Sequence, residues 1–266
     1  MSSTGEAIIV VEDLVAKYGE RTVLDGVSFS VRQGEIFVIL GGSGSGKTTL
    51  IRNLVGLMRP FSGKIDVKGD DFTAMSDDER IELRKKIGVC FQGAALFNSM
   101  TVGDNVALPL REHTSLEEPT IDIMTKIKLE LVGLSGFEDY LPSELSGGMK
   151  KRAGIARAMA MDPAIIFYDE PSAGLDPIVA AGIDGLIRKM QQTFDLTSVV
   201  VTHEMESVKL IADTVCVLEK GRVVGLGSLD ELQRSEHPYI QQFFARRPDA
   251  ESSADSAYAR SLTGLD

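Results

Sequence analysis

The chain has 266 residues, 43% of them hydrophobic and 25% charged, with a formal net charge of -11. That length fits one large domain or a domain with a subdomain, and the composition is typical of a globular protein. The negative charge argues against a broad basic surface, so we expect no nucleic acid partner. No stretch approaches the roughly 18 apolar residues that a membrane-spanning helix needs, so we expect any role at a membrane to come through a partner.

The first elements along the chain are predicted to be short strands between residues 7 and 40. Residues 27–32 alternate apolar and polar side chains, as a half-buried strand does, and residues 35–40 (EIFVIL) indicate a short buried strand. Tyr18 stands just before a predicted turn. Its ring is either an ordinary aromatic of an edge strand or a flat surface on which adenine stacks.

Residues 41–49 (GGSGSGKTT) fit the phosphate-binding pattern G-x-x-x-x-G-K-[ST]. Glycine lets backbone N–H groups approach phosphate oxygens, and the helical repeat that follows would direct a positive N-terminus at them. Lys47 can reach the β- and γ-phosphates, and the Thr48 hydroxyl can hold Mg²⁺. A plain glycine-rich turn is the alternative, but the strand before and the helix after favour a nucleotide. The predicted nucleotide-binding residues here are Gly41, Gly42, Ser43, Gly44, Ser45, Gly46, Lys47, Thr48 and Thr49.

The next part of the chain changes from mixed structure to helix. Residues 64–67 and 86–91 are predicted strands, separated by a charged helix over residues 76–85 that begins with a capping box. Gln92 follows the second strand, and a lone Gln at such a position is usually an ordinary surface residue. Residues 93–145 predict a mainly helical insertion with a polar loop at residues 112–119.

Residues 145–148 (LSGG) precede a segment rich in helix formers. A Ser-Gly-Gly sequence before a helix offers free N–H groups, a hydroxyl and a helix N-terminus, which together suit an anion. Alone, this motif is a weak signal, and a simple helix cap is the alternative.

Two further strands are predicted to end in candidate site residues. Residues 164–169 (AIIFYD) read as a buried parallel strand that carries Asp169 at its carboxyl end, where α/β sheets bind ligands. Asp169 suits Mg²⁺ coordination and Glu170 suits a water-activating base, although a solvated loop start is the alternative. His203 follows the predicted strand at residues 197–202 and is a site candidate for the same reason, with a capping or core histidine as the alternative.

The remaining segments carry less chemical information. Residues 214–225 predict a hairpin, and two short helices follow it. Residues 247–266 are polar and lack a core pattern, which favours disorder or a partner-binding extension. Cys90 and Cys216 each lie in an apolar run without a CxxC partner, so we expect two reduced, buried thiols and no metal site.

Taken together and in their order along the chain, these motifs resemble those of the ATP-binding cassette (ABC) ATPases. The resemblance covers roughly residues 7–245. The motifs are residues 41–49 (Walker A), Gln92 (Q-loop), residues 145–152 (LSGGMKKR, the signature), residues 165–170 (IIFYDE, Walker B and the catalytic acid), residues 172–177 (SAGLDP, the D-loop) and His203 (the switch histidine). The resemblance implies an α/β fold: a RecA-like P-loop core with an N-terminal antiparallel β-subdomain and an inserted α-helical subdomain. Residues 1–92 and 163–246 would form the core and β-subdomain, residues 93–162 the helical subdomain, and residues 247–266 the extension.

The resemblance also implies an ATPase that uses ATP and Mg²⁺. Tyr18 would stack on adenine, and Gln92 would also belong to the nucleotide site. Thr48, Gln92 and Asp169 would hold or sense Mg²⁺. Lys47, Glu170 and His203 would be catalytic, with Glu170 polarising the attacking water and His203 steadying the γ-phosphate. Two copies would form a homodimer around two ATP molecules, with Asp176 communicating between them. The residues completing the partner's site in trans would be Ser146, Gly147, Gly148 and Met149.

The signature departs from the most frequent LSGGQ at Met149, whose thioether cannot donate the hydrogen bonds of an amide. LSGGMKKR, residues 88–114 and YDEPSAGLDP are similar to the lipid-trafficking Mla/Mce-type branch. That resemblance implies a peripheral ATPase on the cytoplasmic face of the inner membrane that powers phospholipid trafficking between inner and outer membranes by dimer closure. Its implied partners are polytopic permease subunits docked near residues 93–116, an MCE-domain lipid-binding protein and a small STAS-domain protein.

Two alternatives to this function stay open. One is the ATPase of an importer for another substrate, such as an amino acid. The other is a soluble ABC protein acting on ribosomes or DNA, although the single cassette, the missing coiled coil and the acidic charge count against it.

Overall fold

The computed structural model describes residues 5–245, so the predicted extension at residues 247–266 lies outside the described residues. Its centre is a six-stranded sheet in the order β10-β9-β3-β8-β7-β6. Every neighbouring pair is parallel except the β9–β10 hairpin. The strands are β3 (Ile36–Leu40), β6 (Ile87–Cys90), β7 (Ile165–Asp169), β8 (Thr197–Thr202), β9 (Thr214–Glu219) and β10 (Arg222–Gly227). Because parallel strands share one direction, the carboxyl ends of β3, β6, β7 and β8 lie along the same edge.

Both faces of this sheet are buried, which explains the continuous apolar runs of its strands. Along β3, Ile36, Val38 and Leu40 belong to a core that the helices cover. Phe37 and Ile39 belong to a second core, shared with α1 (Lys47–Leu54) and the antiparallel sheet. The alternating side chains of one strand therefore join two layers.

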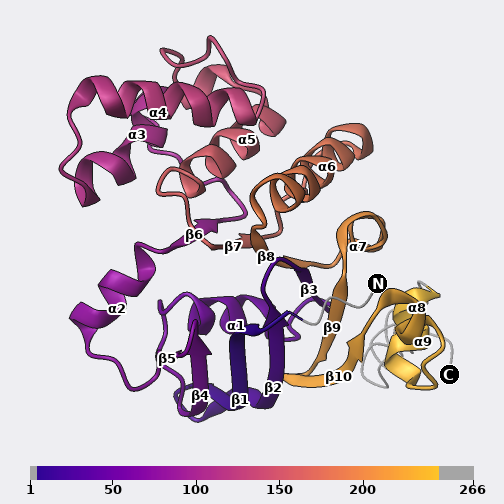
Figure 1. Cartoon of the computed structure of the whole chain (residues 1–266). Coiled ribbons are helices and arrows are strands. Elements are labelled where there is room, and N and C mark those ends of the chain that lie inside the picture. Colours follow the sequence, from indigo (N-terminus) through magenta and orange to yellow (C-terminus); the bar gives the residue numbers. More distant parts are fainter. Residues whose placement is uncertain (1–4, 246–266) are drawn as a thin grey trace, which may run out of the picture.

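A second sheet of four strands, in the order β2-β1-β4-β5, packs below the first (Figure 1). Its strands are β1 (Ala7–Tyr18), β2 (Arg21–Arg32), β4 (Ser62–Val67) and β5 (Asp70–Asp71). The prediction of short strands was wrong here, because β1 and β2 are each 12 residues long. Their pairing shifts register between Val11 and Leu14, and Asp13 has a left-handed φ of 45°. Such a bulge interrupts the alternation, so one long strand resembles several short ones in the sequence.

The helices between β6 and β7 gather at the end of the molecule opposite the antiparallel sheet (Figure 1). They are α3 (Val102–His113), α4 (Glu118–Leu131), the 3-10 turn η1 (Pro142–Glu144) and α5 (Gly147–Ala158). The polar loop expected at residues 112–119 is shorter than predicted and spans only residues 114–117. Pro119 belongs to the first turn of α4, where a helix needs no N–H from it.

The other helices are α2 (Asp77–Arg84), α6 (Pro177–Phe194), α7 (Met205–Ile211), α8 (Leu229–Gln233) and α9 (Pro238–Phe244). The predicted capping box at the start of α2 is confirmed, because Ser76 and Glu79 bond each other's backbone N–H. Cys90 and Cys216 are buried and free, as predicted. Within residues 5–245, no helix has the length and apolar character to cross a membrane. The predicted α/β fold with an antiparallel sheet and inserted helices is confirmed, whereas the exact division into domains stays a prediction.

Candidate nucleotide-binding site

The glycine-rich loop joins β3 to α1 at the carboxyl edge of the central sheet. Gly46 caps α1 with a φ of 106°, a conformation that side chains rarely adopt. A Cβ at Gly41 would lie 2.4 Å from the Leu218 carbonyl oxygen. These two positions therefore require glycine, and they leave the first N–H groups of α1 at the mouth of the loop.

Lys47 lies over this loop in the first turn of α1. Its Nζ donates hydrogen bonds to the carbonyl oxygens of Gly41, at 2.8 Å, and Gly42, at 2.9 Å. Burial lowers the pKa of Lys47, and the carboxylates of Glu170 and Asp169 partly oppose this effect. An ammonium beside free N–H groups makes a cradle that suits a polyphosphate.

The predicted Mg²⁺ ligands come from three elements that end or begin at this edge. Asp169 ends β7, Gln92 follows β6, and Thr48 lies on the first turn of α1; Gln92 and Thr48 are exposed. Burial raises the pKa of Asp169, and the charge of Glu170 adds to this, whereas Arg52 and Lys47 lower it. A carboxylate, a hydroxyl and an amide oxygen are donors that fit Mg²⁺, so this set of residues is chemically suited to the ion.

Glu170 and His203 follow the neighbouring strands β7 and β8, and the structure brings their side chains together. The Glu170 Oε1 atom lies 2.8 Å from Nδ1 of His203. The Glu170 side chain is 11% exposed and that of His203 is 55% exposed. Within the described residues, the buried Oε2 of Glu170 has no hydrogen-bond partner. Glu170 also has a left-handed φ of 49°, a strained backbone that is typical of functional residues.

The signature residues form the N-terminus of α5. Ser146 is the N-cap, and its hydroxyl accepts a hydrogen bond of 3.3 Å from the Met149 N–H. Gly148 packs tightly, because a Cβ there would lie 2.5 Å from Cγ1 of Val179. Ser146 and Gly147 are exposed, and in residues 5–245 no hydrogen bond joins them to the phosphate loop. The cap interpretation is therefore confirmed for the single chain, and the anion-binding role of these residues stays a prediction.

Tyr18 and Asp176 both lie at the ends of secondary-structure elements. Tyr18 is the last residue of β1 and is 49% exposed. Its hydroxyl lies 3.5 Å from the Arg52 guanidinium, and hydrogen bonds from Arg52 and Thr49 lower its pKa. Asp176 is the N-cap of α6 and accepts from two backbone N–H groups there. Stacking of adenine on Tyr18 stays a prediction.

Tyr239, on α9, is a contact of the phosphate loop that sequence reasoning missed. Its hydroxyl accepts a hydrogen bond of 2.9 Å from the Gly42 N–H, across a sequence separation of 197 residues. No periodicity or motif signals a contact of that range. Helix α9 therefore contacts the loop directly.

Tyr239→Phe is expected to lower the free energy of unfolding by about 1 kcal/mol, because the partly buried Gly42 N–H loses its acceptor. Urea denaturation measures this difference. The control is Tyr140→Phe, at a ring that is 44% exposed, which should change the midpoint little. Equal stability of wild-type protein and Tyr239→Phe would show that the hydrogen bond does not stabilise the loop.

A glycine-rich loop between a parallel strand and a helix, with two acids at the carboxyl end of β7 in the same sheet, defines a P-loop nucleotide-binding protein. The family model described as "ABC transporter" matches residues 24–173. The Haemophilus influenzae intermembrane phospholipid transport system ATP-binding protein MlaF is 41% identical over 91% of this chain and 92% of the relative. The probable ribonucleotide transport ATP-binding protein mkl of Mycobacterium leprae is also 41% identical, over 90% of this chain but 69% of the relative.

Solved structures agree with these sequence matches. A dimeric post-hydrolysis state of the ATP-binding cassette MJ0796 with ADP and Pi has a TM-score of 0.77 and 30% identity, covering 83% of this chain and 98% of that one. The structure of cbiO1 from Clostridium perfringens, part of an ABC transporter complex, has a TM-score of 0.78 and 30% identity. The match covers 97% of this chain and 95% of the cbiO1 chain. The chain therefore belongs to the ABC transporter ATP-binding family, and it is an ATPase.

Proposed function

We propose that this chain is the ATPase of a complex that moves phospholipids between an inner and an outer membrane. The observation that carries this proposal is the match to the H. influenzae MlaF protein along nearly the whole length of both chains. The Met149 signature resembles the same branch. The equal identity to a relative named for ribonucleotide transport makes ribonucleotides the second candidate cargo, although that match covers less of the relative.

In this proposal, each catalytic side chain acts from the position described above. Residues 41–49 bind the triphosphate of ATP through N–H groups, with the Lys47 ammonium over the β- and γ-phosphates. Glu170 orients and polarises the attacking water. His203, which is hydrogen-bonded to Glu170, steadies the γ-phosphate. Thr48, Gln92 and Asp169 would hold Mg²⁺, which when bound neutralises phosphate charge.

The second half of each nucleotide site would come from another copy of the chain. Ser146 and Gly147 are exposed and Met149 is partly exposed at the N-terminus of α5, where free N–H groups and the helix dipole suit the γ-phosphate of a partner. The similar MJ0796 cassette was solved as a dimer with ADP and Pi. ATP would close a homodimer and hydrolysis would open it, with the helical residues 93–162 moving relative to the core formed by residues 1–92 and 163–246.

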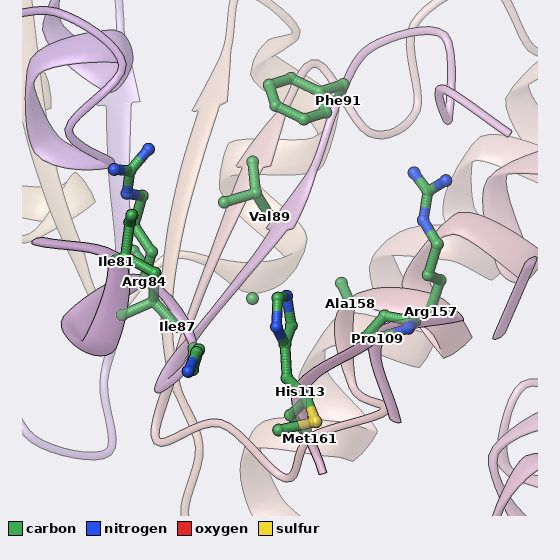
Figure 2. Close-up of a pocket in the computed structure, with 12 residues that line it drawn as sticks. Ile81, Arg84, Ile87, Val89, Phe91, Pro109, His113, Arg157, Ala158 and Met161 are labelled. Carbon is green, nitrogen blue, oxygen red and sulfur yellow. The ribbon is translucent and has the colours of Figure 1, made fainter. Parts of the chain in front are cut away.

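A groove between the core and the inserted helices is the surface on which a polytopic permease would dock. Figure 2 shows Arg84 and Arg157 on opposite sides of it, with His113 between them. Its volume is about 410 Å³, and Phe91, beside Gln92, lines it with its side chain 38% exposed. Motion of a permease element seated there would reach the nucleotide site through Gln92.

The wider assembly follows from the same proposal. The ATPase would be peripheral, on the cytoplasmic face of the inner membrane, and held there by its permease subunits. An MCE-domain lipid-binding protein and a small STAS-domain protein would complete the complex. The predicted extension at residues 247–266 would contact a partner.

Purification of the tagged chain from detergent-solubilised membranes tests this assignment. We expect permease, MCE-domain and STAS-domain proteins to copurify, and phospholipid but not ribonucleotide to stimulate the ATPase of the complex. Phe91→Glu should release the permease, whereas Ile127→Glu, at an exposed residue of α4, should retain it. Copurification of a solute-binding protein, or stimulation by ribonucleotide alone, would assign the chain to another transport system.

A further inference from the structure

Lys151 is a buried lysine on α5, three residues after Gly148, to which neither the motifs nor the proposed mechanism gives a role. Lys151 is only 7% exposed. Its ammonium donates one hydrogen bond to the Gln92 carbonyl oxygen and another, of 3.0 Å, to the Glu170 carbonyl oxygen. One side chain therefore joins the signature helix to the backbone of two residues of the nucleotide site.

A buried ammonium is unfavourable unless its donors are satisfied, and burial lowers the pKa of Lys151. The two carbonyl groups that Lys151 bonds belong to residues in irregular backbone. Glu170 has a left-handed φ of 49°, and Gln92 lies in the turn after β6. Without Lys151, the buried carbonyl of Glu170 and the partly buried carbonyl of Gln92 would each lose a charged donor. Hydrogen bonds from charged donors are among the stronger ones.

We propose that Lys151 is a positioning residue that holds the backbone of Gln92 and Glu170 in its own chain, so that the glutamate faces the attacking water. The helix that carries Lys151 would at the same time serve the nucleotide of the partner through Ser146–Met149. This part of the inference rests on the proposed dimer. In each chain, α5 would therefore contact the nucleotide of the partner and also hold Glu170 of its own site. A shift of α5 at one nucleotide site would then change the position of the catalytic acid at the other site.

The first test compares the kinetics of Lys151→Met, Lys151→Arg and Lys126→Met in the assembled complex. Loss of a charged donor is expected to lower kcat by roughly tenfold to a hundredfold, with the KM for ATP changed by less than about threefold. Lys151→Arg should recover most of this loss, because it keeps a charge and donors. Lys126→Met, at an exposed lysine of α4, should behave as wild type. An unchanged kcat in Lys151→Met would overturn the proposal.

The second test separates action in the same chain from damage to the signature helix. Mixed dimers of a Glu170→Gln chain and a Glu170-intact chain, isolated with two tags, contain one working acid. Adding Lys151→Met to the Glu170→Gln chain should leave the activity of this dimer unchanged. Adding it to the other chain should lower the activity by roughly tenfold to a hundredfold. The reverse pattern would mean that Lys151 acts through the signature, and would overturn the proposal.

The proposed dimer and the role of Lys151 can fail separately in these tests. If Lys47→Ala and Ser146→Arg chains do not complement each other, the shared site is wrong, whatever Lys151 does. If they complement but Lys151→Met has the same effect in either chain, the shared site stands and the positioning role in the same chain falls.

Discussion

Glu170→Gln is expected to reduce the turnover of ATP by about 10²–10⁴-fold, the usual contribution of a general base. The amide keeps the shape of the side chain and can still contact His203, which lies 2.8 Å from the carboxylate in the native protein. It cannot accept a proton from water. Steady-state phosphate release measures the loss, and equilibrium binding of ATP should change little because Glu170 does not contribute to the phosphate loop.

The matched control for this variant is Glu130→Gln, at an exposed residue near the end of α4. It removes the same charge far from the sheet edge and should leave turnover unchanged. Turnover of Glu170→Gln within a few-fold of wild type would remove Glu170 from the role of the base, and another group would have to activate the water.

Lys47→Ala is expected to weaken ATP binding and to lower turnover by about 10²–10³-fold, the usual effect of removing one preorganised donor. The ammonium now holds the carbonyls of Gly41 and Gly42, so its loss affects both the shape of the loop and its charge. Isothermal titration and phosphate release measure the two effects.

Lys126→Ala on α4 serves as the control, because it removes an exposed lysine outside the loop. It should bind and hydrolyse ATP as the wild type does. Native affinity for ATP in Lys47→Ala would contradict the assignment of residues 41–49 as the phosphate cradle.

The sequence predicts the candidate site well where function depends on a contiguous motif or on the end of a strand. The phosphate loop is continuous in sequence, so its pattern survives without knowledge of the fold. Asp169, Glu170 and His203 lie far from the loop in sequence, but Asp169 ends a buried apolar strand and the other two each follow one. Parallel pairing of β3, β8 and β7 brings these strand ends together.

Contacts that depend on three-dimensional packing could not be predicted in this way. Tyr239 meets Gly42 across 197 residues, and Lys151 meets the Gln92 carbonyl across 59. Neither contact has a repeating pattern, and a backbone N–H or carbonyl as the partner carries no residue identity. The length of β1 could not be predicted either. The bulge at Asp13 interrupts the alternation of apolar and polar residues, so the sequence does not show that β1 is one continuous strand.

The proposal that two copies share each nucleotide site is tested most directly by mixing a Lys47→Ala chain with a Ser146→Arg chain. Each variant alone should be inactive, because every site in its homodimer carries a defect. Random pairing should restore about one quarter of the wild-type sites, since half of the dimers contain both chains and each of these has one sound site. Phosphate release that stays at the level of the single variants, or mixed dimers that retain both sites, would contradict the shared site.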